Sequence, residues 1–213
     1  MGDDTIELVW DICRRLGFVE SGLAVTGPHT RDIACERIID LLDDAGMSVE
    51  QAIVQSSTME DVKLVEEKIR EQHPQVILGV GGGMKIDVAK LSSARQNIPF
   101  ISIPTSASHD GIAGPLASVK GLRQPYSEMA QSPMAIIADT SIITQAPHRF
   151  TASGCGDSIS KFTAVRDWQL ANRMKNEYYG GYAASLALMS ARLVAKNAGS
   201  MKRRIESGIR VLL

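Results

Sequence analysis

Two loop regions carry side chains that could bind a ligand or a metal ion. In "FISIPTSASHDGIAGPLASVK" (100–120), an apolar run ends at Pro104, and small hydroxyl residues then lead to His109 and Asp110 beside Gly111. Loops at the carboxyl ends of parallel strands are where open α/β sheets bind their ligands. The pattern therefore indicates a binding loop with two titratable groups. A polar turn with one hydrogen-bonded histidine would give the same pattern, so both interpretations stay open.

The segment "SGCGDSISK" (153–161) places a single acid, Asp157, at what we expect to be the start of a helix. A carboxylate there interacts favourably with the positive end of the helix dipole. It could equally be one ligand of a metal site whose other ligands come from elsewhere in the sequence. Local spacing does not decide between these two roles.

The third candidate is the glycine-rich segment "VGGGMKID" (80–87), which follows an apolar strand and precedes a helix. Glycines allow close approach of a phosphate, and the free N–H groups of a helix start face the anion. The segment matches neither the G-x-G-x-x-G fingerprint nor the P-loop, so a tight turn that needs glycine only for steric reasons is the alternative. We expect Asp87 in the first helical turn. In dinucleotide folds, an acid after the second strand holds the ribose hydroxyls, and its absence makes room for a 2′-phosphate. Here the strand at 51–55 is followed by no acid until Glu60, so the sequence leaves NADP possible.

Alternating helices and strands are expected to position these loops. Helices are expected over residues 6–17, 30–46, 58–72 and 85–96, and strands over 22–27, 51–55, 74–83, 99–106 and 134–143. Strand–helix alternation predicts an α/β fold with a Rossmann-like parallel sheet covered on both faces. From about residue 151 the strand signal disappears. We therefore predict a dinucleotide-binding domain over 1–150 and the start of an all-helical metal- and substrate-binding domain over 151–213.

The composition excludes several classes of protein. The 213 residues are 44% hydrophobic and carry a formal net charge of −1, so no basic surface for nucleic acid is expected. Three widely spaced cysteines argue against a disulfide framework and for a reducing compartment. The N-terminus is acidic where a signal peptide would be basic, so we expect no signal peptide. No apolar run is long enough to span a bilayer, so we expect no membrane insertion. We expect a cytoplasmic protein.

The segments "GVGGGMKIDVAK", "FISIPTSASHDGIA" and "SGCGDSISK", in this order and at these intervals, resemble the sn-glycerol-1-phosphate dehydrogenase family. That family is related to glycerol dehydrogenases, iron-type alcohol dehydrogenases and 3-dehydroquinate synthases. The resemblance covers about residues 20–175. It implies an NAD(P)-dependent enzyme that reduces dihydroxyacetone phosphate to sn-glycerol 1-phosphate in archaeal-type ether phospholipid biosynthesis. It also implies a homo-oligomer at full length and a Zn²⁺ ion that polarises the ketone.

The resemblance assigns roles to individual residues. It implies that Asp110 and Asp157 are catalytic and contact the substrate, and that Asp157 also binds zinc. It implies a cofactor-binding set made of Gly81, Gly82, Gly83, Met84, Lys85, Ile86, Asp87, Thr105, Ser106, Ala107, Ser108 and Gly114. The family usually has serine where this chain has Gly114, which puts that contact in doubt.

Two further zinc ligands implied by the resemblance, both histidines downstream of Asp157, have no counterpart. All four histidines (His29, His73, His109 and His148) precede Asp157. We expect His73 to end a helix, His148 to lie in an exposed turn, Cys155 to fill a tight approach rather than bind metal, and Lys161 to be solvated rather than paired with Asp157 or a phosphate.

We therefore expect the chain to be a piece of a longer enzyme, inactive alone. The alternatives are a glycerol dehydrogenase or 3-dehydroquinate synthase relative, and a non-catalytic nucleotide-binding module.

Overall fold

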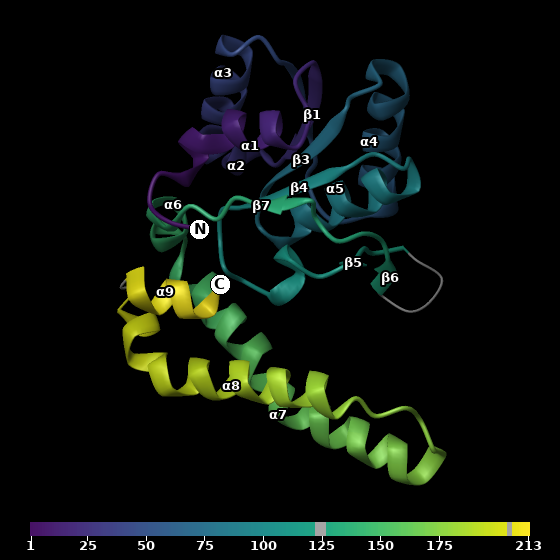
Figure 1. Ribbon diagram of the computed structural model, residues 1–213, viewed down its shortest axis with the longest axis vertical. Coiled ribbons are helices and arrows are strands. Elements are labelled where there is room, and N and C mark those ends of the chain that lie inside the picture. The colour runs from purple at the N-terminus through teal and green to yellow at the C-terminus, as the bar shows by residue number, and fades with distance from the viewer. Residues whose placement is uncertain (122–126, 204–205) are drawn as a thin grey trace. The chain divides into compact units, whose positions relative to one another are not determined.

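The computed structural model describes residues 1–121, 127–203 and 206–213, and these residues form two compact units (Figure 1). The first unit consists of Met1–Ser106 and Gly111–Gln145, and the second of Ala107–Asp110 and Ala146–Leu213. The chain thus leaves the first unit after the fourth strand of its sheet, contributes four residues to the second, and returns.

The first unit alternates helices and strands, as the apolar periodicity predicts. Its helical elements are η1 (Thr5–Leu8), α1 (Val9–Arg15), α2 (Pro28–Thr30), the π-helical turn η2 (Arg31–Cys35), α3 (Glu36–Asp44), α4 (Met59–Gln72), α5 (Gly83–Arg95), η3 (Asp110–Ile112, whose first residue belongs to the second unit) and α6 (Thr140–Gln145). Its strands are β1 (Ser21–Thr26), β2 (Ser48–Ile53), β3 (Val76–Gly81), β4 (Phe100–Pro104), β5 (Leu116–Ser118), β6 (Ser127–Met129) and β7 (Ala135–Ile136).

Five of these strands form one sheet in the order β2-β1-β3-β4-β7, and every pairing in it is parallel. The α/β fold with a parallel, Rossmann-like sheet is therefore confirmed. The strand order reverses between β1 and β3, because β2 lies on the far side of β1. In open α/β sheets, the crevice outside the carboxyl ends of the strands at such a reversal is the usual place for a ligand.

Helices cover both faces of the sheet (Figure 1). On one face, Cys13 of α1 and Ile38 of α3 belong to a buried cluster with Leu78 of β3 and Ile101 of β4. On the other face, α5 packs on β3, where a Cβ at Gly79 would lie 3.0 Å from the Cβ of Ala89 and 2.7 Å from a ring carbon of Phe100. Glycine at position 79 thus lets α5 approach the sheet closely, which fixes the helix that carries the glycine-rich loop.

Helix ends follow the local sequence signals in several places. Thr58 is the N-cap of α4, and its hydroxyl accepts a hydrogen bond from the Asp61 N–H, as the capping-box pattern predicts. His73 ends the same helix with φ 50°, which confirms its expected position. Gly17 and Gly46 follow α1 and α3 with φ 85° and 89°, the left-handed conformation that favours glycine.

The strand predicted over 134–143 is wrong in its second half. Only Ala135–Ile136 pair with β4, and residues from Thr140 onward form α6. The helix begins there because the Asp139 carboxylate accepts the N–H of Ser141 at 3.0 Å, as helix N-caps do. The antiparallel pair β5–β6 was not predicted either, since its strands have three residues each.

The second unit is helical, as expected for the end of the sequence. Its helices are α7 (His148–Lys175), α8 (Gly181–Lys202) and α9 (Glu206–Leu212). Helices α7 and α8 pack side by side (Figure 1), and Trp168 of α7 makes edge-on ring contacts with Tyr178 and Tyr179 in the connection between them. None of the described helices is long and apolar enough to cross a membrane.

Asp157 does not begin a helix, which corrects the expectation from "SGCGDSISK". Helix α7 starts at His148, with Pro147 as N-cap, and runs through Asp157 without interruption. The expectation for His148 is corrected in the same way: the residue is exposed as predicted, but it lies in the first turn of helix α7 rather than in a turn between elements. Two glycines before Asp157 had suggested a helix boundary, and tertiary packing overrides their low helix propensity.

Candidate nucleotide-binding loop and acidic cluster

The glycine-rich segment forms the turn from β3 to α5, at the point where the strand order reverses. Gly81 has φ 155°, a conformation that strongly favours glycine. Gly82 is the extended N-cap residue of α5, and its carbonyl accepts the N–H groups of Lys85 at 2.9 Å and Ile86 at 3.2 Å. The preceding N–H groups of this helix have no partner within it. The turn thus offers backbone donors and the positive end of a helix dipole, which suit a phosphate.

The segment after β4 lies against this turn. The Thr105 N–H donates to the Gly81 carbonyl at 3.0 Å. A Cβ at Gly82 would lie 3.3 Å from the Ser106 hydroxyl. Thr105 and Ser106 are both buried in the first unit. The structure therefore brings together two segments that the family resemblance assigns to one cofactor site.

The other predicted cofactor residues differ in what their side chains do. The Met84 side chain is exposed, whereas Ile86 is fully buried in the core below the helix. Gly114 lies in a bend between η3 and β5, with intermediate exposure. Ala107 and Ser108 belong to the second unit. Of this group, Ile86 contributes packing that holds the helix start, and Gly114 has no side chain to offer a ligand.

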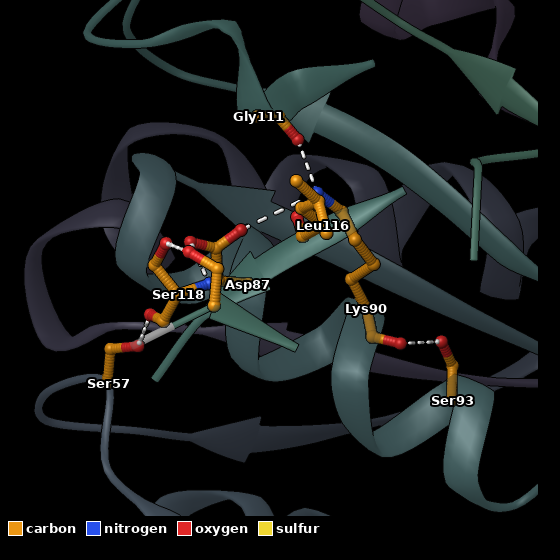
Figure 2. Close-up of polar contacts among 8 residues, drawn as sticks. Ser57, Asp87, Lys90, Ser93, Gly111, Leu116 and Ser118 are labelled. Carbon is orange, nitrogen blue, oxygen red and sulfur yellow. Dashed lines mark hydrogen bonds and ion pairs between the residues drawn. The ribbon is translucent and has the colours of Figure 1, made fainter. Parts of the chain in front are cut away.

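Asp87 makes its contacts inside the first unit (Figure 2). Its Oδ2 accepts the Ser118 N–H of β5 at 3.1 Å, and its Oδ1 lies 3.5 Å from the Nζ of Lys90. Because α5 begins at Gly83, Asp87 lies in its second turn, beyond the first turn where we expected it. The carboxylate thus ties α5 to β5.

Lys90 is a fully buried lysine that the sequence analysis did not single out. Figure 2 shows its Nζ directed toward the carbonyls of Gly111 and Leu116, which accept hydrogen bonds at 2.5 Å and 2.8 Å. A buried ammonium needs such compensation for its lost hydration. The Asp-x-x-Lys spacing on one helix, which puts both side chains on the same face, was the available signal. Lys90 thus anchors both ends of residues 111–116, which begin with the glycine of the His-Asp-Gly motif.

In the second unit, Asp110, Asp157 and Lys161 form a cluster of two carboxylates and one ammonium. The Asp157 Oδ2 accepts the backbone N–H of Asp110 at 2.9 Å. The Nζ of Lys161 lies 2.7 Å from the Asp110 Oδ2 and 3.9 Å from the Asp157 Oδ1. The two acids that the sequence paired by resemblance are thus neighbours, although 47 residues separate them along the chain.

The expectation of a solvated Lys161 is wrong. Burial alone would lower the pKa of Lys161, but the hydrogen bond to Asp110 and the charges of Asp110 and Asp157 outweigh it and raise the pKa. The lysine therefore stays protonated and neutralises part of the charge of the two acids. The spacing of Asp157 and Lys161 on α7 was the signal for their pairing, whereas the contact with Asp110 depends on tertiary structure.

Gly154, rather than Cys155, occupies the tight approach in "SGCGDSISK". A Cβ at Gly154 would lie 2.1 Å from the Ala107 carbonyl oxygen, which no side chain could accept without movement. Cys155 is partly exposed, and its Sγ lies 3.3 Å from the Met201 Sδ. Gly154 and Asp110 also help to line a small recess of about 30 Å³ in the second unit. Glycine at 154 therefore lets residues 107–110 lie against α7 and brings Asp110 to Asp157.

These residues do not form a complete zinc site. A catalytic zinc takes three protein ligands and an open position. Over residues 1–121, 127–203 and 206–213, no group of three His, Cys, Asp or Glu side chains could hold a metal ion. Both carboxylates of the acidic cluster already share Lys161. We therefore derive no chemical step through zinc.

Sequence comparison agrees with the parallel-sheet α/β fold. The family described as iron-containing alcohol dehydrogenase matches residues 1–147, and the chain belongs to this family. The chain is similar over its whole length to proteins named glycerol-1-phosphate dehydrogenase [NAD(P)+], with 49% identity in Methanosarcina mazei and 44% in Thermococcus kodakarensis. It spans 60% and 61% of the length of these two relatives.

Solved structures agree on the fold. The glycerol dehydrogenase of Schizosaccharomyces pombe superposes with a TM-score of 0.82 at 23% identity, over 99% of this chain and 57% of that one. The sulfoacetaldehyde reductase of Bifidobacterium kashiwanohense, solved in complex with NAD+, gives a TM-score of 0.75 at 19% identity, over 99% of this chain and 61% of that one. At these identities the likeness extends to the fold alone.

Proposed function

We propose that this chain binds a nicotinamide dinucleotide and serves in the interconversion of dihydroxyacetone phosphate and sn-glycerol 1-phosphate. The observation that carries the dinucleotide part is the hydrogen bond from Thr105 to Gly81, which joins the segment after β4 to the glycine turn where the strand order reverses. The choice of substrate follows the names of the relatives that are 44–49% identical over the whole chain.

The dinucleotide would be held mainly by backbone groups. Gly81, Gly82 and Gly83 offer N–H donors and the space for a pyrophosphate at the start of α5. Met84, Lys85, Ile86 and Asp87 continue this loop, and Thr105, Ser106, Ala107, Ser108 and Gly114 complete the proposed set. When bound, the cofactor donates or accepts a hydride. The NAD+ complex of the sulfoacetaldehyde reductase, which shares this fold, supports the proposal.

Asp110 and Asp157 are the proposed substrate ligands. Carboxylates accept hydrogen bonds from the hydroxyl groups of a small polyol. The Asp110 carboxylate is 68% exposed and Asp157 is 31% exposed, so both can reach a ligand. The Nζ of Lys161 lies between the two acids and orients the Asp110 carboxylate through the 2.7 Å ion pair. Zinc stays a prediction: Asp157 would be one ligand, and the remaining ligands would have to be side chains other than those described.

Three further parts of this proposal follow the resemblance of the sequence motifs and the composition rather than the geometry. They are a cytoplasmic location, assembly into homo-oligomers, and a role in archaeal-type ether phospholipid synthesis. Mass spectrometry of the intact assembly tests the oligomer. A monomer at micromolar concentration would contradict that part alone.

Binding and turnover test the two halves of the proposal separately. We expect the 213-residue chain to bind NADH or NADPH, measured as enhanced nicotinamide fluorescence. Gly82→Val should weaken binding several-fold, because its side chain would fill the space between the turn and Ser106. Gly156→Ala is the matched control, since a Cβ there has nothing within 4 Å. Wild-type protein that binds neither dinucleotide would overturn the proposal.

Substrate choice is tested with Zn²⁺ by oxidation of NAD(P)H in the presence of dihydroxyacetone phosphate or dihydroxyacetone. Turnover of the phosphate ester alone supports the proposal, and turnover of dihydroxyacetone alone favours a glycerol dehydrogenase. A nucleotide-binding module without catalysis is the second candidate, because the described residues lack a three-ligand metal group. Tight stoichiometric binding of zinc would exclude that module.

A further inference from the structure

Lys85 follows an unusual path across the carboxyl edge of the sheet. A Cβ at Gly81, the last residue of β3, would lie 2.9 Å from the Lys85 Cγ. A Cβ at Gly27, directly after β1, would lie 2.4 Å from the Lys85 Cε. The Nζ then donates to the carbonyl of Gln55, just beyond β2, at 2.9 Å. The side chain thus crosses the ends of three neighbouring strands, from β3 over β1 to β2.

Two glycines make this path possible. A side chain at Gly27 would displace the end of the Lys85 side chain from this path, and Gly81 combines close contact with φ 155°. The stem is packed and the whole residue is 8% exposed. The ammonium is therefore held at a fixed place beside the reversal of the strand order, instead of moving freely in solvent as surface lysines do.

The ammonium is only partly satisfied. A lysine has three N–H donors, and within the described residues Lys85 has the one hydrogen bond to Gln55 and no carboxylate at ion-pair distance. Burial lowers the pKa of Lys85, and the charge of Asp61 opposes this effect. A buried cation with donors to spare is a favourable partner for an anion.

Asp61 is the nearest competing charge, and its oxygens are already occupied. They accept hydrogen bonds from the Gln55 N–H, the Ser56 hydroxyl, and the N–H and hydroxyl of Thr58. Burial would raise the pKa of Asp61, but these hydrogen bonds outweigh it and lower the pKa. The hydrogen bonds that cap α4 thus occupy the Asp61 carboxylate.

In dinucleotide folds of this type, the pyrophosphate lies at the glycine turn and the adenosine ribose lies toward the ends of the adjacent strands. An acid at those ends binds the 2′-hydroxyl, and a cation there accommodates a 2′-phosphate. We propose that Lys85 recognises the 2′-phosphate of NADPH and gives this chain a preference for NADPH over NADH. This inference rests on the proposed dinucleotide binding and adds the residue that selects the cofactor.

The experiment measures dissociation constants of NADPH and NADH for the wild-type chain and for Lys85→Met, which keeps the packed stem and removes the charge. We expect Lys85→Met to weaken NADPH binding by about 10-fold or more and NADH binding by less than about 2-fold, the size of one charge-assisted contact. Lys63→Met, at an exposed position on α4, is the control and should change neither constant. Adenosine 2′,5′-bisphosphate and 5′-AMP should repeat the difference without the nicotinamide.

A readout on the wild-type chain covers the case in which Lys85→Met does not fold. NADPH should protect Lys85 from acetylation more strongly than NADH, as followed by mass spectrometry with Lys63 as internal reference. The assignment of Lys85 would be overturned if Lys85→Met weakened the binding of both cofactors equally or of neither. It would also be overturned if NADPH and NADH protected Lys85 equally from acetylation. In each of those results dinucleotide binding itself persists, whereas a wild-type chain that binds neither cofactor contradicts the proposed function as well.

Discussion

At the scale of single residues, the two buried lysines of α5 have different roles. Lys85 reaches toward the strand ends and keeps unused donors, whereas Lys90 is turned inward and bonds two carbonyls and an aspartate. The first arrangement suits ligand recognition, and the second suits the positioning of a loop. Both side chains stay buried because their polar ends find oxygen acceptors, which offsets the cost of desolvation.

Replacement of Lys90 should weaken the fold. Lys90→Met removes the donor to the Gly111 and Leu116 carbonyls and leaves the buried Asp87 carboxylate without its ammonium neighbour. We expect the free energy of unfolding, measured by urea denaturation, to fall by about 2–4 kcal/mol. The exposed Lys63→Met serves as reference. A loss no greater than that of an ordinary surface change, about 0.5 kcal/mol, would show that Lys90 does not anchor this segment.

At the scale of secondary-structure elements, α7 shows how packing overrides a local signal. Glycines at 154 and 156 suggested a boundary, yet the helix continues from His148 to Lys175. Packing requires glycine only at position 154, because a Cβ there would collide with the Ala107 carbonyl, whereas a Cβ at position 156 would have no atom within 4 Å. Two glycines that look equivalent in the sequence are therefore not equivalent in the fold.

Alanine at these two positions should have opposite effects. Gly156→Ala should stabilise α7 by about 0.5–1 kcal/mol, the difference in helix propensity. Gly154→Ala should lose stability overall, because the new Cβ would collide with the carbonyl at 2.1 Å. Urea denaturation followed by circular dichroism measures both. If Gly154→Ala were also stabilising, residues 107–110 could not lie against the helix as described.

The sequence allowed the order of the main strands and helices to be predicted, because buried parallel strands and amphipathic helices have distinct periodicities. It did not allow prediction of short elements such as β5 and β6, which have three residues each. The candidate acids were predictable from their motifs. The contact of Lys161 with Asp110 and the anchoring by Lys90 were not, because both depend on contacts between residues at least 21 positions apart.

At the scale of the whole molecule, the two units differ in the size of their cores. Among the described residues, buried apolar side chains are numerous in the first unit, whereas those of the second are Ala107, Val165, Ala184, Ala191, Val194, Met201 and Ile209. Since apolar burial is the main source of stability, we expect the second unit to open under milder conditions than the first.

The three cysteines report on this order of unfolding. Burial raises the pKa of Cys13 to about 11 and that of Cys35 to about 12, and it also raises the pKa of Cys155. All three should therefore react slowly with a thiol reagent at pH 8 in the folded chain, since the thiolate is the reactive form. In a urea series, Cys155 should be labelled at lower urea than Cys13 and Cys35. Simultaneous labelling would mean that the units unfold together.

The close packing of Lys85 over Gly27 couples the evolution of these two positions. A side chain gained at 27 while the lysine remains at 85 would displace the end of the lysine side chain from its path to the Gln55 carbonyl. The effect of each substitution thus depends on the other, which is epistasis arising from one steric contact. In a laboratory selection for altered cofactor use, substitutions at positions 27 and 85 would therefore not act independently.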